Sequence, residues 1–267
     1  MTSKLLGVHA KLRRADAHIE TLRAQLFAAM GGPEGEAFRA GFRYETYDGH
    51  PAVTLFVTKL PTFPLEISVL MGEIVHDLRS GLDQLAWALI PPPIRRQLKP
   101  GAAQQIYFPM AGSRRNFDNR VNQWLPGTTS DQRRFIQLYQ PYHRSAEGRA
   151  MRTLRNLSNT DKHRVLVPAL FFPLTHSTKV DFKKGPRRLA KVVRIARGHQ
   201  MQLRSDLLTW TFSEQPEIVK IDYKIANSPG FHPRLVRPAP GNDLEDVGGT
   251  LKTIAAACRQ IVAHFDV

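Results

Sequence analysis

Apolar residues recur at every third or fourth position along three long stretches of the chain, which is the pattern of an amphipathic helix. The predicted helices cover residues 4–29, 64–90 and 243–265. Pro91-Pro92-Pro93 ends the second helix, because proline cannot donate the hydrogen bond that continues a helix. Asn242 or Asp243 suits the start of the third, since a short polar side chain can cap the first free amides. A loop is expected from the proline triplet to about residue 106, and shorter helices at 113–124, 130–139 and 145–160.

Apolar and polar residues alternate elsewhere in the chain, which is the pattern of a β-strand with one buried face. Residues 42–58 show this pattern on both sides of Asp48-Gly49, a dipeptide that favours the tight turn of a hairpin. After residue 164 the same alternation dominates the sequence. Further strands are expected at 165–172, 178–183, 189–197, 200–204, 207–212 and 217–225.

The order of these elements predicts an α+β fold. Strands and helices do not alternate as they do in a parallel α/β sheet, because one block is mainly helical and the next is mainly strands. We expect a single domain in which the long N-terminal, central and C-terminal helices form a layer that packs on an antiparallel sheet. Its parts would be residues 1–164 (mainly helical, with the hairpin at 42–58), 165–226 (mainly strands) and 243–265 (the C-terminal helix).

Net charge separates this chain from an average globular protein. Apolar residues make up 42%, which is ordinary and enough for a packed core. Lys and Arg number 38 against 23 Asp and Glu, so the formal net charge is +15. Such an excess favours polyanionic partners, with nucleic acid ahead of an anionic membrane surface.

Cysteine usage and the apolar runs indicate a cytoplasmic protein. Cys258 is the single cysteine, so no intrachain disulfide can form, and it lies in an apolar helical pattern typical of a core residue. The first residues lack the apolar run of a signal peptide. The most apolar stretch, residues 165–174, is too short to span a bilayer and contains two prolines. We therefore expect no membrane partner, and the oligomeric state stays open.

The helix predicted at 64–90 carries a first set of chemically active side chains. His76, Arg79 and Asp83 follow one another at helical spacing and share one face. A histidine near a carboxylate can act as a general base, so His76 and Asp83 are candidate catalytic residues. The alternative is a solvated polar face with one ion pair between Arg79 and Asp83. The polar half of this helix is expected to hold Gly72, Glu73, His76, Asp77, Arg79, Ser80, Asp83 and Gln84.

The segment at 151–166 carries a second set. Arg152, Lys162 and Arg164 are candidate anion-binding residues, because Arg and Lys donate strong hydrogen bonds to phosphate. Arg155 and His163 are candidate catalytic residues alongside them. The alternative is a helix C-terminus whose basic residues face the negative end of the helix dipole.

Both segments resemble known families. VLMGEIVHDLRSGLDQLAWAL (69–89) and LRNLSNTDKHRVL (154–166), with FP at 108–109 and QPY at 140–142, resemble a large family of bacterial and phage proteins. That family is known by its HNLRSALDHL-like and NxDKHR-like segments and carries no assigned activity. The likeness covers about the first two-thirds of the chain. Asp77, Gly81 and Gln84 stand where Asn, Ala and His are usual in the family, which weakens a metal site on this helix.

A fainter resemblance concerns the HEPN-type helical ribonucleases, which pair an Arg with a His four to six residues further on. Arg155-Asn156 matches the start of that motif, but seven residues separate Arg155 from His163. The resemblance implies an Arg that binds the scissile phosphate and a His that moves a proton.

Residues 179–204 are the most basic part of the chain, with nine Lys or Arg and one Asp. Strands here would form a basic ribbon that follows phosphates, with Trp210, Phe212 and Tyr223 as candidates for stacking on bases. The alternative is a charged hairpin that keeps a sheet edge from aggregating. The candidate nucleic-acid contacts are Lys183, Lys184, Arg187, Arg188, Lys191, Arg194 and Arg197.

Three functions stay open. The first is a nucleic-acid-binding protein of weak sequence specificity, for RNA before DNA. The second is a metal-independent, HEPN-like endoribonuclease or phosphodiesterase, and the third is a protein-partner module of a defence or toxin system. No phosphate-binding loop, dinucleotide fingerprint or zinc-protease motif occurs, so neither a cofactor nor a metal is expected.

Overall fold

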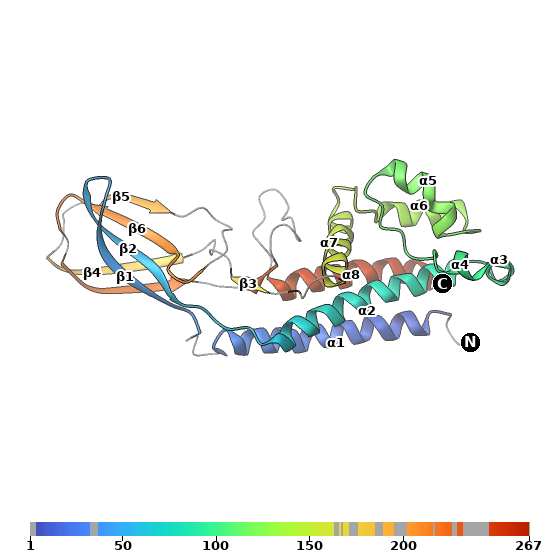
Figure 1. Ribbon diagram of the computed structural model, residues 1–267, viewed down its shortest axis with the longest axis horizontal. Helices are drawn as coiled ribbons and strands as arrows, with labels where there is room; N and C mark the ends of the chain where they lie inside the picture. Colours follow the sequence, from blue (N-terminus) through green and yellow to red (C-terminus); the bar gives the residue numbers. More distant parts are fainter. Residues whose placement is uncertain are drawn as a thin grey trace.

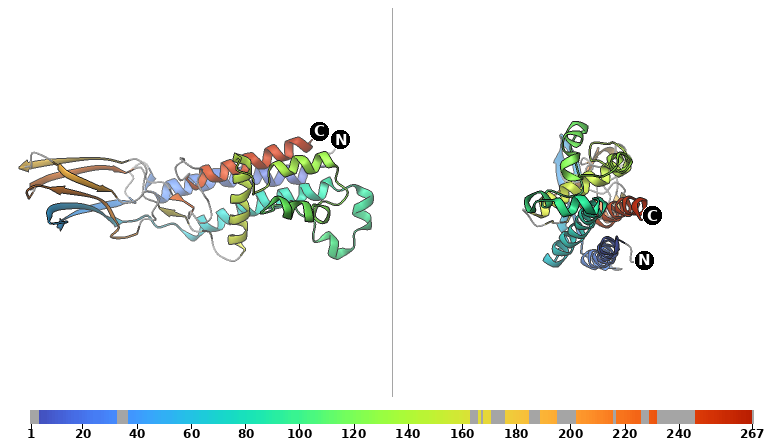
Figure 2. Two further views of the ribbon diagram at one scale, coloured as in Figure 1. Left: turned by 90° about the horizontal axis from the view of Figure 1, so that it is seen from above. Right: turned by 90° about the vertical axis from the view of Figure 1, so that its right-hand side faces the viewer.

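The computed structural model describes residues 4–32, 37–162, 166, 168–170, 176–184, 189–194, 202–215, 217–225, 229–231 and 246–266. The molecule is elongated, with helices at one end and antiparallel strands at the other (Figure 1). The same arrangement is seen from above in Figure 2. Helices and an antiparallel sheet are both present in separate blocks, so the predicted α+β class is confirmed.

Four helices form the bundle: α1 (Leu6–Ala29), α2 (Leu65–Leu89), α7 (Ala146–Asp161) and α8 (Val247–Phe265). α1 lies along α2 and α8, while α7 crosses both α2 and α8 (Figure 1). All four were predicted, with ends that differ by a few residues. The cap of α8 is a correction: Asp246, and not Asn242 or Asp243, accepts a hydrogen bond from the Gly249 amide.

The bundle core is built from the apolar stripes that the sequence showed. On α1 the buried residues are Val8, Leu12, Ala15, Ile19, Leu22 and Leu26, and they meet a fully buried row on α2 that includes Ile74, Leu78, Leu82 and Leu85. Cys258 of α8 is buried in the same core, and this burial raises the pKa of its thiol to about 12. No helix among the described residues is both long and apolar enough to cross a membrane.

Ion pairs fasten the first helix to the last along the bundle surface. Lys252 lies 2.8 Å from Glu20, His9 lies 2.9 Å from Asp266, and Arg259 pairs with Asp16. The two marked chain ends therefore lie at the same end of the molecule, away from the strands (Figure 1).

Four smaller helices lie beside the bundle: α3 (Pro92–Gln97), α4 (Pro100–Ala103), α5 (Arg114–Trp124) and α6 (Ser130–Leu138). α3 and α4 occupy a stretch that was expected to be a loop, because Pro92 fits the first turn of a helix as well as it ends one. Ser113 caps α5, and Thr129 forms a capping box with Gln132 on α6.

The main sheet has the strand order β1-β2-β6-β5, and every pair in it is antiparallel. The predicted hairpin is confirmed: Asp48 and Gly49 both have positive φ, as a tight two-residue turn requires. Two further strand pairs complete the β structure, β4 with β7 and β3 with β8. The strands are β1 (Arg39–Tyr47), β2 (His50–Lys59), β3 (Ala169–Leu170), β4 (His176–Lys184), β5 (Leu189–Arg194), β6 (Asp206–Phe212), β7 (Glu217–Ile225) and β8 (Pro229–Gly230).

One predicted strand is wrong where it can be checked. Residues 202–205, at the end of the expected strand 200–204, form a turn. Arg204 has a φ of 68°, and its amide donates to the Val57 carbonyl at 2.9 Å. The alternation of Gln202 and Leu203 is too short to distinguish a strand from a turn.

The two ends of the molecule have separate cores. One apolar cluster joins the helices, and a second contains Val53, Leu55 and Val57 of β2 with Leu208 and Trp210 of β6. Phe63, between β2 and α2, packs against both clusters. The helices thus lie end to end with the sheet and do not form a layer over it as expected, because their apolar stripes are already buried against one another.

Candidate functional site

The described helical parts of the two motif segments, residues 73–84 of α2 and 152–161 of α7, belong to helices that pack against each other. At Gly72 an added Cβ would lie 2.5 Å from Oδ1 of Asp161, so a side chain at this position would displace the Asp161 carboxylate. Gly72 is buried, which corrects its predicted place on the polar half of the helix.

Arg79 and Asp83 bind the backbone of a loop between α4 and α5. The Phe108 amide donates to Asp83 at 2.9 Å, and Arg79 donates to the Phe108 carbonyl at 3.0 Å. The two side chains also pair with each other at 2.9 Å. Burial raises the pKa of Asp83, although Arg79 and the Phe108 amide oppose this. Asp83, predicted as catalytic, therefore holds a structural hydrogen bond.

Gln140 and Arg152 bind backbone in the same way. Gln140 is fully buried; it accepts from the Ala111 amide at 2.9 Å and donates to the Pro109 carbonyl at 2.9 Å. Arg152 donates to the Pro141 carbonyl at 2.8 Å. We call these two residues, with Arg79 and Asp83, the backbone clamps. They bind the backbone of the FP and QPY segments, so three residues of the family-like segments, Arg79, Asp83 and Gln140, stabilise irregular backbone.

Arg155 differs from the backbone clamps because its guanidinium donates no hydrogen bond to backbone within the described part of the chain. It is half-buried, and its Nη1 lies beside Gly112, where an added Cβ would be 3.4 Å away. Burial lowers the pKa of Arg155, and the like charge of Arg152 adds to this. Within the described part of the chain we find no acceptor bonded to it. Lys162 is exposed after the end of α7, while the predicted site residues His163 and Arg164 lie outside the described residues.

His76 is exposed and faces a pocket of about 710 Å³ between the start of α1 and the end of α2. Asp83 lines the same pocket, so two of the predicted catalytic residues share a cavity. Arg155 is not among its lining residues, and the predicted set is therefore split. The lining consists of Lys4, Gly7, Val8, His76, Ser80, Asp83, Gln84, Trp87, Ala88 and Arg95.

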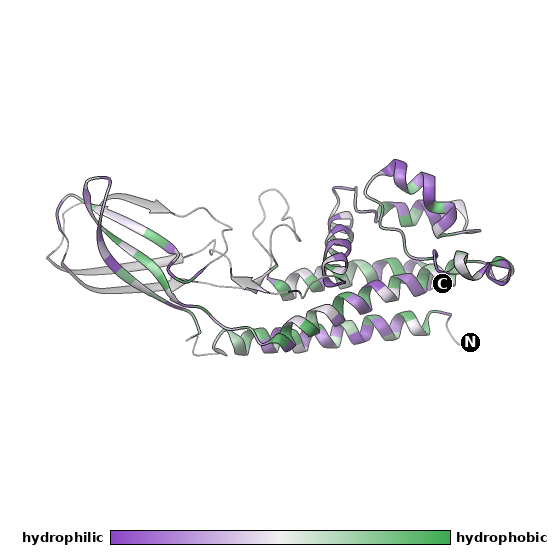
Figure 3. Ribbon diagram, viewed as in Figure 1, coloured by the Kyte–Doolittle hydropathy of each residue, from purple (hydrophilic) through white to green (hydrophobic). Residues whose placement is uncertain are grey.

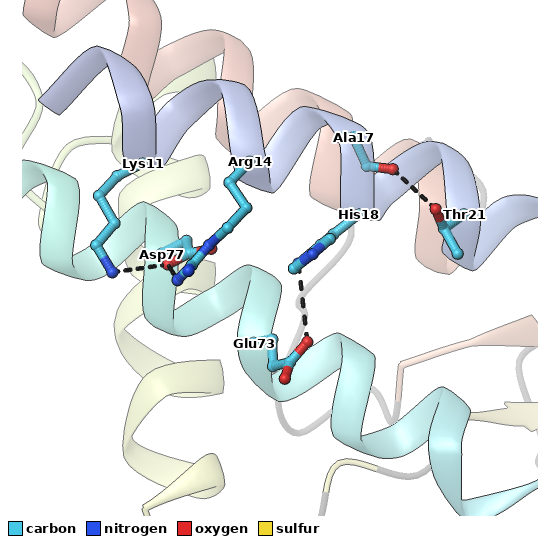
Figure 4. Close-up of polar contacts among 7 residues, drawn as sticks. All are labelled: Lys11, Arg14, Ala17, His18, Thr21, Glu73 and Asp77. Carbon is cyan, nitrogen blue, oxygen red and sulfur yellow. Dashed lines mark hydrogen bonds and ion pairs between the residues drawn. The ribbon is translucent and has the colours of Figure 1, made fainter. Parts of the chain in front are cut away.

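The most deeply buried charge of the bundle was not singled out from the sequence. Asp77 is fully buried, although it was expected on the polar half of its helix. Its carboxylate accepts from Lys11 at 3.0 Å and from Nε of Arg14 at 2.5 Å, both on α1 (Figure 4). Burial would raise its pKa, but the hydrogen bonds from Arg14 and Lys11 outweigh that effect and lower the pKa. Glu73, one turn away, is exposed and lies 3.8 Å from His18.

A signal for Asp77 was present in the spacing. Asp77 is four residues from Gly81 and seven from Leu70, so it borders the apolar stripe of α2. Lys11 and Arg14 are three residues apart beside the stripe of α1 and can reach the same point. A carboxylate at such a border needs cations from the neighbouring helix.

In the strands of the basic segment, several basic residues stand opposite acidic residues on the neighbouring strand. In the β4–β7 register, Lys179 is opposite Asp222 and Asp181 is opposite Lys220. Lys184 is likewise opposite Glu217. On β5, Lys191 is opposite Thr211 and Arg194 is opposite Leu208, so these two basic residues are on opposite faces. In this register the basic residues of the segment do not all fall on one face. Lys183 lies on β4, while Arg187, Arg188 and Arg197 lie outside the described residues.

The predicted base-stacking residues are also placed differently. Trp210 and Phe212 are buried in the core of the sheet, so their assignment to base stacking is wrong. They alternate with threonines on a central strand, and the sequence pattern could not tell which face was covered. The side chain of Tyr223, the third candidate for base stacking, lies outside the described part of the structure.

A second basic region was missed. Residues 113–155 contain nine Arg, no Lys and three acidic residues. They form α5 and α6, which lie beside the bundle, and most of α7, which crosses it (Figure 1). Because the arginines are spread over forty residues with several apolar anchors between them, they do not stand out as a charge run.

Within the described chain, no group of three or more His, Cys, Asp and Glu side chains is placed to hold a metal ion. Comparison with known proteins adds no family. No protein-family model matches the chain, and neither does any curated protein or any solved structure. The two family resemblances therefore stay predictions.

Proposed function

We propose that this protein binds nucleic acid, RNA before DNA, through phosphate contacts of low sequence specificity. The observation that carries the proposal is the arginine-rich region at 113–155. Arg115, Arg134 and Arg144 are exposed there, and none of them has an acidic partner within the part of the chain that is described. Arginine suits this role because its planar guanidinium can bind phosphate through two hydrogen bonds.

Other arginines of the region shape this surface. Arg114 pairs with Asp118 at 2.8 Å, and Arg133 donates to Thr128 at 3.0 Å. Arg120 lies over the Trp124 ring, 5.3 Å from its centroid, as in a cation–π contact. Hydrophilic residues predominate along α5 and α7 (Figure 3). Contacts to phosphate carry no sequence information, which is why we expect weak specificity.

We expect the basic strands to contribute less to nucleic-acid binding than the sequence suggested. Lys179, Lys184 and Lys220 stand opposite acidic residues in the register, which reduces the net field that a phosphate backbone would meet. Lys191 and Arg194 remain without acidic residues opposite them in the register.

The test compares two triple variants that change net charge equally. Arg115→Glu, Arg134→Glu and Arg144→Glu remove the proposed contacts, while Arg13→Glu, Lys99→Glu and Arg204→Glu change exposed residues elsewhere. Binding to a fluorescent 20-nucleotide RNA is measured by anisotropy over a salt series. We expect the first variant to weaken binding about tenfold or more and to make the slope of log K against log salt shallower by about 2.

Equal weakening by both variants would mean that net charge alone acts, and would contradict the assignment to α5–α7. Failure of the unaltered protein to bind at low salt would overturn the proposal.

The ribonuclease hypothesis stays a prediction with less support. α2 and α7 do meet, but the Asp83 carboxylate is bonded to backbone and Arg155 does not line the pocket of His76. The protein-partner hypothesis has no observation in its favour beyond net charge.

A further inference from the structure

The pocket between α1 and α2 has the size of a small-molecule site. Its volume of about 710 Å³ lies within the roughly 300–1,000 Å³ typical of ligand pockets. Gly7 and Val8 of α1, Ser80 and Gln84 of α2, and Arg95 of α3 line it, so three helices contribute. The arginine-rich helices contribute nothing to the lining, so this pocket is separate from the proposed RNA surface.

The charge of the lining favours an anionic ligand. Lys4 and Arg95 bring two positive charges to the pocket, and Asp83 brings its one negative charge. That carboxylate is already paired with Arg79 at 2.9 Å and bonded to the Phe108 amide. An anion would therefore meet two cations whose charge the lining does not balance.

Arg95 carries the strongest indication. Its Nε is buried and has no hydrogen-bond partner within the described part of the chain. No acidic side chain pairs with its guanidinium in the described part of the chain, so its charge is available to an anion in the pocket. Lys4 is exposed and lines the same pocket, and it has no acidic partner among the described residues either.

The lining also offers a flat apolar wall. Trp87 is 39% exposed, and Val8 and Ala88 lie in the same pocket. Arg95 lies over the Trp87 ring, 6.0 Å from its centroid, which holds the guanidinium beside the wall. Ser80, His76 and Gln84 add polar atoms that can hydrogen-bond to a sugar or a ring edge.

We propose that this pocket binds a phosphorylated nucleoside, with the phosphate bound by Lys4 and Arg95 and the ring placed along Trp87. The volume, the two cations and the aromatic wall together fit this class of ligand. The source is either a free mononucleotide or the 5′-phosphorylated end of an RNA chain, which share the same chemistry.

The test uses isothermal titration calorimetry with 5′-AMP, adenosine and inorganic phosphate on the full chain. We expect 5′-AMP to bind one to one and more tightly than either of its parts. Arg95→Ala and Lys4→Ala should each weaken binding about tenfold or more, because a hydrogen bond to a charged group is lost. Trp87→Leu should weaken the binding of 5′-AMP but leave the binding of inorganic phosphate unchanged.

Arg96→Ala is the matched control, since Arg96 is the exposed neighbour on the same short helix and does not line the pocket. It should bind 5′-AMP as the unaltered protein does. No heat from 5′-AMP at millimolar concentration would overturn the proposal. Unchanged binding by Arg95→Ala, or phosphate that binds as tightly as 5′-AMP, would also overturn it.

The source of the ligand is decided by short RNAs that end in a 5′-phosphate or a 5′-hydroxyl. If the protein prefers the phosphorylated end and Arg95→Ala abolishes this preference, the result supports the proposed site and identifies an RNA end as its ligand. Binding of 5′-AMP without that preference would support it with a free nucleotide. Both readings are separable from the RNA surface, because the Arg115, Arg134 and Arg144 triple variant should retain 5′-AMP binding.

Discussion

In the helical bundle, polar side chains bind backbone from distant parts of the chain, whereas in the sheet they join strands that are already paired. Gln140 reaches Pro109 and Ala111, thirty residues away. In the sheet, Thr54 of β2 donates to Glu45 on one adjacent strand and shares a hydrogen bond with Thr209 on the other. The difference follows from the backbone. A strand satisfies its amides in the ladder, but the loops around the bundle must find side-chain partners.

The separate cores suggest that the two ends unfold separately. Leu78→Ala in the bundle and Leu55→Ala in the sheet remove equal side chains that are both almost fully buried. Each should cost about 3 kcal/mol of local stability, the middle of the usual range for this change. Hydrogen exchange should show lost protection in the helices for the first variant and in the strands for the second. Loss of protection across the whole molecule in either variant would instead support the single domain predicted from the sequence.

The buried ion cluster should matter more than the exposed pair one turn away. Asp77→Ala should lower the free energy of unfolding by about 2–3 kcal/mol, because it leaves two cations without their buried partner, although both can reach solvent. Glu73→Ala is the control and should change it by less than about 0.5 kcal/mol. Denaturant unfolding measures both. Similar losses in the two variants would mean that Asp77 is no more important than a surface charge.

A backbone clamp should act locally on the loop that it holds. Gln140→Ala leaves the Ala111 amide and the Pro109 carbonyl without their partner and should cost about 2 kcal/mol. Exchange at residues 107–112 should rise before exchange in the helices does. Gln97→Ala, at an exposed position on α3, is the control and should leave that loop unchanged. Intact protection of the loop in the Gln140 variant would show that other contacts hold it.

The two carboxylates of α2 should give opposite pH dependences. The lowered pKa of Asp77 contributes stability above its usual value of 3.8 that is lost as the pH falls below it. The raised pKa of Asp83 makes the folded state hold its proton longer, so its contribution is present at low pH and is lost as the pH rises through the folded pKa. Between pH 3 and 7 the advantage of the unaltered protein over Asp77→Asn should shrink on acidification, and that over Asp83→Asn should grow. Parallel curves would contradict both assignments.

Most of the elements could be predicted, because apolar periodicity depends only on neighbours in the sequence. The stripe of α2 and the turn at Asp48-Gly49 are examples. The arrangement of helices and sheet could not be predicted, since nothing local says whether an apolar stripe meets another helix or a strand. For the same reason Trp210 and Phe212 were predicted to be accessible for base stacking, although both are buried in the core of the sheet.

The candidate site was harder to predict than the fold. Arg79 and Asp83 were found as a pair on one helical face, but their role depends on Phe108, which only the folded chain brings beside them. The burial of Asp77 depends on Lys11 and Arg14, which only the packing of α1 against α2 brings to its carboxylate. The pocket joins α1, α2 and α3, and no spacing along one segment indicates it. The sequence pattern thus located these polar residues, but only the folded structure shows which of them have a structural role and which can bind a ligand.

The ion pairs that fasten α8 to α1 have a consequence for synthesis of the protein on the ribosome. α1 is made early, yet the helix that completes its core follows about 220 residues later. At roughly 5–20 residues per second this is a delay of about 10–40 s. During that time the apolar stripe of α1 is covered by α2 alone. The nascent chain therefore presents an unfinished helical surface until its final segment emerges, which makes it a substrate for chaperones that recognise exposed apolar helices.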